Sequence, residues 1–144
     1  MKAELFNALR DLMLAAGDIR HVALWNQQVA FLEEEEPFEL PAVFVEFAPI
    51  EWGKYDKSLK SGRNILRSDP RITLHLLTPS TWTDTQTLEF TDCFSDRFAG
   101  ISVKDNDGNI LVGNFMHAAS ATNHDHEEIV ESLETFTYRG YKFY

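Results

Sequence analysis

The sequence predicts an α+β fold in which two helices pack on one face of a mainly antiparallel sheet of about five strands. The 144 residues fit a single domain, 1–144, and are enough to bury a core without disulfides. Two segments have the apolar spacing of amphipathic helices, and several others have the alternation of strands. The strands come in runs that one helix interrupts, and this order favours α+β.

The first helix is expected over residues 2–16, where Leu5, Leu9 and Leu12 form one apolar stripe that Phe6 and Met13 join. Gly17 follows at a position where helices commonly adopt a left-handed backbone conformation, which costs little only for glycine. The helix is therefore expected to end just before Gly17, so that the chain can turn into the first strand.

Four strands are expected before the second helix, over residues 21–25, 42–52, 64–67 and 71–79. The segment 42–52 is apolar on both faces apart from Glu46 and, near its end, Glu51, which predicts a central strand. In the segment 71–79, apolar residues alternate with Arg71, Thr73 and His75, which predicts a strand with a single buried face.

Two polar segments separate these strands. Residues 33–41 contain two prolines and a run of four glutamates that repel one another, so a solvated loop is expected. Those glutamates are Glu33, Glu34, Glu35 and Glu36. Residues 53–70 are long, polar and basic relative to the rest of the chain, and they are expected to form a flexible loop with the short strand 64–67 inside it.

A second helix is expected around residues 84–99, with Thr83 or Asp84 as its N-cap. Aromatic residues spaced by four place their rings on the face expected to pack on the sheet: Phe90, Phe94 and Phe98. Cys93 flanks this face and is interpreted as a buried filler of the core rather than as a nucleophile.

After that helix, residues 101–122 predict a β-hairpin, because Asp107-Gly108 is a type I′ turn signal between two apolar stretches. Residues 127–144 predict one last long strand that carries aromatic residues up to the end of the sequence.

Charge and cysteine content exclude several function classes. The chain has 13 basic and 23 acidic residues, a net charge of −10, which argues against a nucleic-acid backbone or an anionic membrane as the main partner. The single cysteine allows no intrachain disulfide, so a reducing compartment is expected. The N-terminus lacks the pattern of a signal peptide, and no apolar run is long enough to span a membrane.

The most chemical stretch of the sequence is His124-Asp125-His126, which two glutamates follow. Two histidines two residues apart share one face of a strand and can bind zinc, which would make the protein a small metal-dependent hydrolase. A zinc site needs a third and usually a fourth ligand, and the sequence contains no recognised metalloprotease or deaminase motif. The favoured interpretation is a polar bend before the closing strand, with no metal, no cofactor and no catalytic residues.

Aromatic residues near the predicted element ends leave a third possibility open. Trp25, Trp52 and Trp82 lie in or beside loops, and tyrosines are frequent near the C-terminus. Tryptophan and tyrosine are enriched at protein–protein interfaces, so a binding module without enzymatic activity is an alternative function. Each of these residues taken alone is slightly better explained as the edge of a core.

The layout resembles the tail terminator and minor tail proteins of long-tailed bacteriophages and prophages. In that family an N-terminal helix and a strand precede a strand of the type Pro41–Val45, and a strand like Arg71–Leu77 follows a variable loop. A helix then crosses the sheet, here around 84–99, and a hairpin leads to an aromatic final strand, here Leu133–Tyr138. The family has no catalytic residues, so the resemblance implies a structural protein.

The resemblance implies a ring of identical subunits, commonly a hexamer, that caps the tail tube and joins it to the head while DNA passes through without specific binding. It implies assembly in the cytoplasm of a bacterial host and a final place in the virion tail. It also implies that subunits contact the acidic surfaces of their neighbours through basic residues, for which the candidates are Lys54, Lys57, Lys60 and Arg63. The glutamates Glu33–Glu36 are candidates for those acidic surfaces, or they face the channel and repel DNA.

Overall fold

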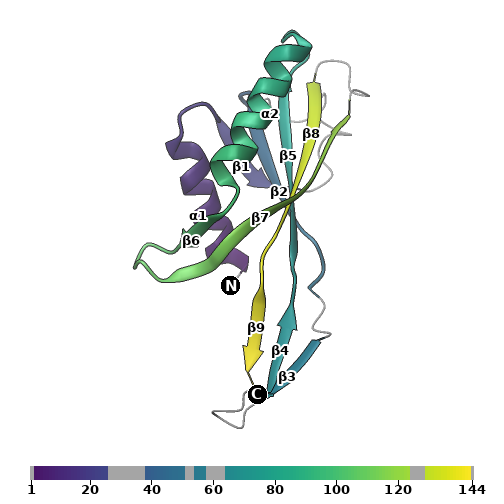
Figure 1. Ribbon diagram of the computed structural model, residues 1–144. Coiled ribbons are helices and arrows are strands. Elements are labelled where there is room, and N and C mark those ends of the chain that lie inside the picture. The colour runs from purple at the N-terminus through teal and green to yellow at the C-terminus, as the bar shows by residue number, and fades with distance from the viewer. Residues whose placement is uncertain (1, 26–37, 51–53, 58–63, 124–128, 144) are drawn as a thin grey trace.

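The computed structural model of the chain describes residues 2–25, 38–50, 54–57, 64–123 and 129–143 (Figure 1). Within these residues the chain forms two helices and nine strands, which divide into a six-stranded and a three-stranded sheet. The prediction of an α+β fold is confirmed. The main sheet has six strands where about five were expected, and it is mixed rather than antiparallel throughout.

The first helix, α1 (Lys2–Ala15), buries Leu5, Leu9 and Met13 completely, and Gly17 follows it with a φ of 85°. The predicted helix end is therefore confirmed. The predicted stripe is partly wrong, because Leu12 is 40% exposed. At about 100° per residue, the buried stripe is centred on Leu9, and Leu12 lies about 60° away from that centre.

The second helix, α2 (Asp84–Phe98), starts at a capping box, in which Thr83 accepts a hydrogen bond from the backbone N–H of Gln86 and the Gln86 side chain accepts one from Thr83. The face that packs on the sheet consists of Thr87, Thr91, Phe94, Ser95 and Phe98.

Cys93 is exposed, so its interpretation as a buried filler is wrong. Cys93 directly precedes the buried Phe94, so its side chain points about 100° away around the helix axis. It therefore lies outside the face that packs on the sheet. Phe94 and Phe98 are buried as predicted, whereas Phe90 is only half-buried.

The six-stranded sheet has the order β1-β2-β5-β8-β7-β6. Its strands are β1 (His21–Leu24), β2 (Ala42–Phe47), β5 (Arg71–Pro79), β8 (Ile129–Thr137), β7 (Ile110–Asn123) and β6 (Ile101–Lys104). All neighbours are antiparallel except β1 and β2, which are parallel. Parallel neighbours need a crossover of a dozen residues or more, and residues 25–41 provide that length.

Both helices pack on one face of this sheet, where they share a single core with the inward side chains of the central strands (Figure 1). Ile72, Leu74 and Leu76 of β5 point into this core as the alternation predicts. The expectation of one buried face is wrong for β5, because His75 and Leu77 on the opposite face are also buried. A second, smaller cluster covers them there.

The hairpin predicted over residues 101–122 is confirmed as β6 and β7, but its turn is not the two-residue type I′ turn. Asp105 N donates to Asn109 O at 2.9 Å, which closes a three-residue loop, and Gly108 takes a φ of 84° at its last position. The Asp105 carboxylate accepts backbone N–H bonds from Asp107 and Asn109 at 2.9 and 2.8 Å, so the aspartate shapes the longer loop.

The three-stranded sheet has the order β3-β4-β9, and we refer to it as the arm. Its strands are β3 (Lys54–Lys57), β4 (Asn64–Ser68) and β9 (Gly140–Phe143). Figure 1 shows the arm extending away from the body of the protein, at the end opposite to the start of α2. Two strands thus lie within residues 53–70, where one short strand in a flexible loop was expected.

The arm continues the two central strands of the body. Strands β5 and β8 pair from Pro79↔Ile129 to Arg71↔Thr137, and β4 and β9 take up the same register from Ser68↔Gly140 onward. Pro70, between them, has no N–H, but its carbonyl accepts bonds from Thr137 Oγ1 at 2.9 Å and Tyr138 N at 3.3 Å. One antiparallel ribbon of about 50 Å therefore runs through both sheets.

Candidate functional site

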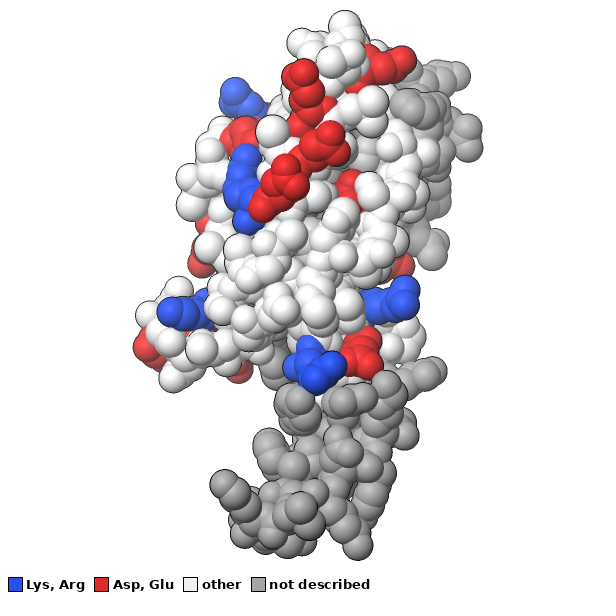
Figure 2. Space-filling view, in the orientation of Figure 1, with Lys and Arg blue, Asp and Glu red and all other residues white. Residues whose placement is uncertain are grey.

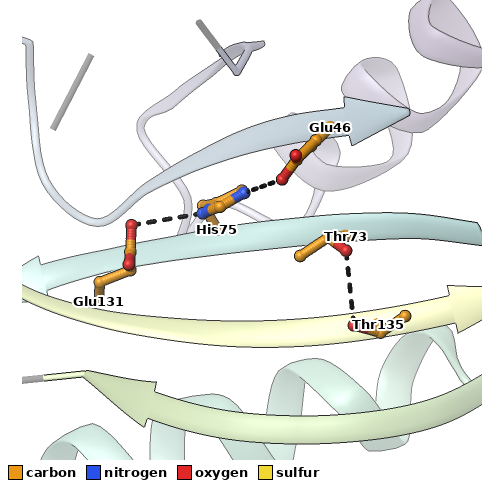
Figure 3. Close-up of polar contacts among 5 residues, drawn as sticks. All are labelled: Glu46, Thr73, His75, Glu131 and Thr135. Atoms are coloured by element: carbon orange, nitrogen blue, oxygen red, sulfur yellow. Dashed lines mark hydrogen bonds and ion pairs between the residues drawn. The ribbon is translucent and has the colours of Figure 1, made fainter. Parts of the chain in front are cut away.

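Three adjacent strands place a charged cluster on the sheet face that the helices leave uncovered (Figure 3). Glu46 lies on β2, His75 on β5 and Glu131 on β8, and the strand register brings all three side chains to this face. His75 Nε2 lies 2.6 Å from Glu46 Oε2, and His75 Nδ1 lies 3.3 Å from Glu131 Oε2. His75 and Glu131 are each only 6% exposed.

Trp25, directly after β1, covers the imidazole of this cluster. The indole and the His75 ring are stacked with centroids 3.7 Å apart and an interplanar angle of 4°. The same indole meets the buried Phe44 edge-on. The imidazole thus has an aromatic ring against one face and a carboxylate at each nitrogen, and these contacts connect the chain at β1, β2, β5 and β8.

The chemistry open to His75 is limited because both ring nitrogens already have partners. Ionised carboxylates only accept hydrogen bonds, so both contacts are satisfied together when the ring carries two protons or when one carboxyl carries a proton. A general base or a metal ligand needs a nitrogen that faces its target. Within the part of the chain that the structure describes, no group of His, Cys, Asp and Glu side chains has the arrangement of a metal site.

A second buried carboxylate lies on the helix side of the same sheet. Glu134 of β8 is 1% exposed, and its two oxygens lie 2.6 Å from His117 Nε2 and 2.6 Å from Ser120 Oγ. Both partners belong to β7, so this cluster fastens β7 to β8 on the side where the helices pack.

The structure places only some of the residues predicted from the sequence. Lys54 and Lys57 are the first and last residues of β3, and Trp82 packs edge-on against Phe90 at 5.7 Å. The remaining predicted contact residues and metal candidates lie outside the described residues: Lys60, Arg63, Glu33, Glu34, Glu35, Glu36, His124, Asp125, His126 and Trp52.

The sequence contained one signal of the His75 cluster. Glu46 is the only charged residue in an otherwise apolar strand, and a charge in that position needs a partner. Alternation assigned His75 to a polar face, because it stands between leucines, and so its burial could not be foreseen. The partner Glu131 comes from a strand 56 positions further along the chain, a contact that no local pattern encodes.

Charge is divided unevenly along the sequence. Residues 54–70 and 139–143, which contain the arm strands, hold seven of the 13 basic residues and two of the 23 acidic ones. The rest of the chain keeps six basic and 21 acidic residues. On the described surface, acidic side chains gather over α2 (Figure 2), where Asp84, Glu89, Asp92 and Asp96 are exposed.

An ion pair on this acidic surface joins α2 to the turn that follows α1. Arg97 near the end of α2 donates two hydrogen bonds to the carboxylate of Asp18, at 3.0 and 2.9 Å. The hydrogen bond from Arg97 holds the pKa of Asp18 below its ordinary value. The pair borders a shallow groove along α2 that also contains the exposed Cys93 and Trp82.

The fold and these features define a class: a two-helix α+β protein with a curled mixed sheet and a projecting β-arm of opposite charge. No protein-family model matches the chain, and no curated protein matches it in sequence. None of the helices in the described segments is long and apolar enough to cross a lipid bilayer.

Proposed function

We propose that the protein is a structural subunit of a phage or prophage tail that assembles into a ring, as tail terminator proteins do. The observation that supports this proposal is the arm, which extends from the body and whose excess of positive charge opposes the negative charge of the body. In the ring, the arm of each subunit contacts the body of the next one.

The shape of the arm favours an intermolecular contact. A two-stranded hairpin is marginal in water, and a three-stranded sheet needs a hydrophobic face or a packed element for independent stability. The arm is an extension of β5 and β8 beyond the region that the helices cover, so the best source of such an element is another subunit (Figure 1). A neighbour that covered it would convert an exposed ribbon into an interface.

The charge of the two parts favours the same contact. The arm segments carry a net charge of about +5 and the remainder about −15, from the residue counts above. Arm-to-body contact between copies brings opposite charges together, whereas body-to-body contact brings like charges together. An arm-to-body interface joins two different surfaces, and such a head-to-tail interface closes into a ring when its rotation permits.

The place of the ring in a virion follows from the resemblance to tail terminator proteins. Its partners are then other copies of the chain, the tail tube and the head-joining proteins. A negatively charged body lining the channel repels DNA, so DNA passes through without specific binding. Assembly occurs in the cytoplasm of the bacterial host, and the ring stays in the virion tail.

The test is the oligomeric state, measured by light scattering and native mass spectrometry with and without tail-tube protein. The wild-type chain is expected to form a ring, and a variant with both Lys54→Glu and Lys57→Glu is expected to stay monomeric. The matched control carries Lys2→Glu and Lys104→Glu, which change the net charge equally at exposed sites outside the arm. A monomer at every concentration, alone and with tube protein, would falsify the proposal.

A further inference from the structure

We propose that the outer half of β7 is an acceptor edge to which β3 from the arm of a second copy adds as a further strand. This inference rests on the proposed ring function and names the surface that receives the arm. Strand β7 is long, but it uses different halves for its two neighbours. Residues 110–115 pair with β6, and residues 116–123 pair with β8.

The half of β7 that pairs with β8 has an open edge on its other side. Figure 1 shows this half beyond β8, at the margin of the main sheet. Within the described parts of the chain, β8 is the only strand that pairs with residues 116–123. All five residues from Ala118 to Thr122 are exposed. Their outward backbone N–H and C=O groups are therefore available to another strand.

This edge has fewer features that prevent the addition of another strand than the opposite margin of the sheet has. Natural proteins block edges with charged residues, prolines, bulges or short strands. At the opposite margin, β1 is only four residues long. Residues 119–123 of β7 include neither charge nor proline, and the one irregularity is a bulge at Ala118 where the register with β8 shifts. An open, regular and uncharged edge of this kind favours strand addition.

Charge decides between two possible occupants, both of them from a second copy. Pairing of β7 with β7 of another copy would join two bodies of like negative charge. Pairing with the arm joins the negative body to the positively charged segment of the chain. Among the residues that the structure describes, β3 is an outer strand of the arm sheet and pairs only with β4, so its second edge can pair with β7. The arm is therefore the favoured occupant.

Disulfide trapping tests the contact directly, in a Cys93→Ser background that removes the single native thiol. One set of proteins carries a cysteine on the β7 edge, at Ala119 or Ala121, and a second set carries one on β3, at Lys54 or Asp56. Cysteines bridge only when their Cα atoms come within about 7 Å, so trapping reports adjacent strands. Mixing the two sets is expected to give several-fold more disulfide-linked dimer than either set alone.

A cysteine at Thr85, exposed on α2, provides the matched control and is expected to link with neither set. Dimers formed by the β7 proteins alone would overturn the inference, because the edge would then pair with itself. A ring that assembles without linking β7 to β3 would also overturn it and would leave the proposed ring function standing. Failure of both the ring and the links would remove the two proposals together.

Discussion

At the scale of the residue, His75 makes close contacts through both ring nitrogens and through one ring face. Its two nitrogens face carboxylates, its ring is stacked on Trp25, and it is almost fully buried. A buried polar cluster of this kind is weak evidence of net stabilisation, but removing one member takes a close contact away from the others. The cluster is therefore a position where a single substitution has a large effect.

We predict that His75→Ala lowers the free energy of unfolding by about 3 kcal/mol, because it leaves the buried Glu131 carboxylate without its imidazole partner and opens a cavity. Urea denaturation followed by circular dichroism measures the loss. Adding Glu131→Gln to His75→Ala is expected to restore part of it, because the neutral amide costs less to bury than a carboxylate. If the double variant were less stable than His75→Ala, the cavity alone would explain the effect.

The ion pair between Asp18 and Arg97 gives a pH-dependent prediction. Because the pKa of Asp18 is lowered in the folded protein, the folded state binds fewer protons there than the unfolded state does. The stabilisation is complete above the ordinary pKa of 3.8 and is lost as pH falls through the lowered pKa. Asp18 is 41% exposed, so solvent screening keeps the effect small.

We expect Asp18→Asn to cost about 0.5–1 kcal/mol at pH 7, the range for an exposed pair with good geometry. The difference between variant and wild type should shrink as the pH is lowered from 5 to about 2. The control is Asp11→Asn, because Asp11 has a single 3.6 Å contact with Arg10 and should lose less stability. A difference that stays constant across this pH range would contradict the role assigned to Asp18.

At the scale of the element, the sequence predicts best where the pattern is local. The caps of both helices followed from Gly17 and Thr83, because capping depends on residues within one turn. The hairpin of β6 and β7 was predicted for the same reason, but its turn type was not. Asp105 adds side-chain bonds that a dipeptide signal at Asp107-Gly108 does not include.

The sequence predicts poorly where a partner comes from far along the chain. Residues 53–70 have little hydrophobic alternation, and their two strands form because β9 continues the register of β8 alongside β4. Likewise, the parallel pairing of β1 with β2 depends on where the intervening segment returns, which no periodicity records. The arm, which carries the proposed function, is for this reason the element that sequence patterns described least well.

At the scale of the whole molecule, the ribbon shared by β4-β5 and β8-β9 links the arm to the centre of the body. Because the register does not change across Pro70, the arm cannot slide relative to the core without breaking the pairs on both sides. A load on the arm is thus carried to the strands at the centre of the sheet. This property suits a subunit whose neighbour holds it by the arm.

Salt dependence is the whole-molecule prediction, because the attraction between arm and body is a property of summed charge. The Debye length falls from about 30 Å at 10 mM salt to about 3 Å at 1 M, so association of wild-type subunits should weaken steadily over that range. Sedimentation velocity at several salt concentrations measures the association constant.

Two charge variants test whether attraction between the arm and the body drives association. Replacing both Lys54 and Lys57 with glutamate should weaken association most at low salt and flatten its salt dependence, because two of the seven basic residues in the arm segments are reversed. The control with Lys2→Glu and Lys104→Glu should keep the wild-type slope. Association that strengthens with salt would show that apolar burial drives assembly, since such burial is not screened and is favoured by some salts. Apolar contacts of the added strand would then be the main part of the interface, with the charges of the arm serving only to orient it.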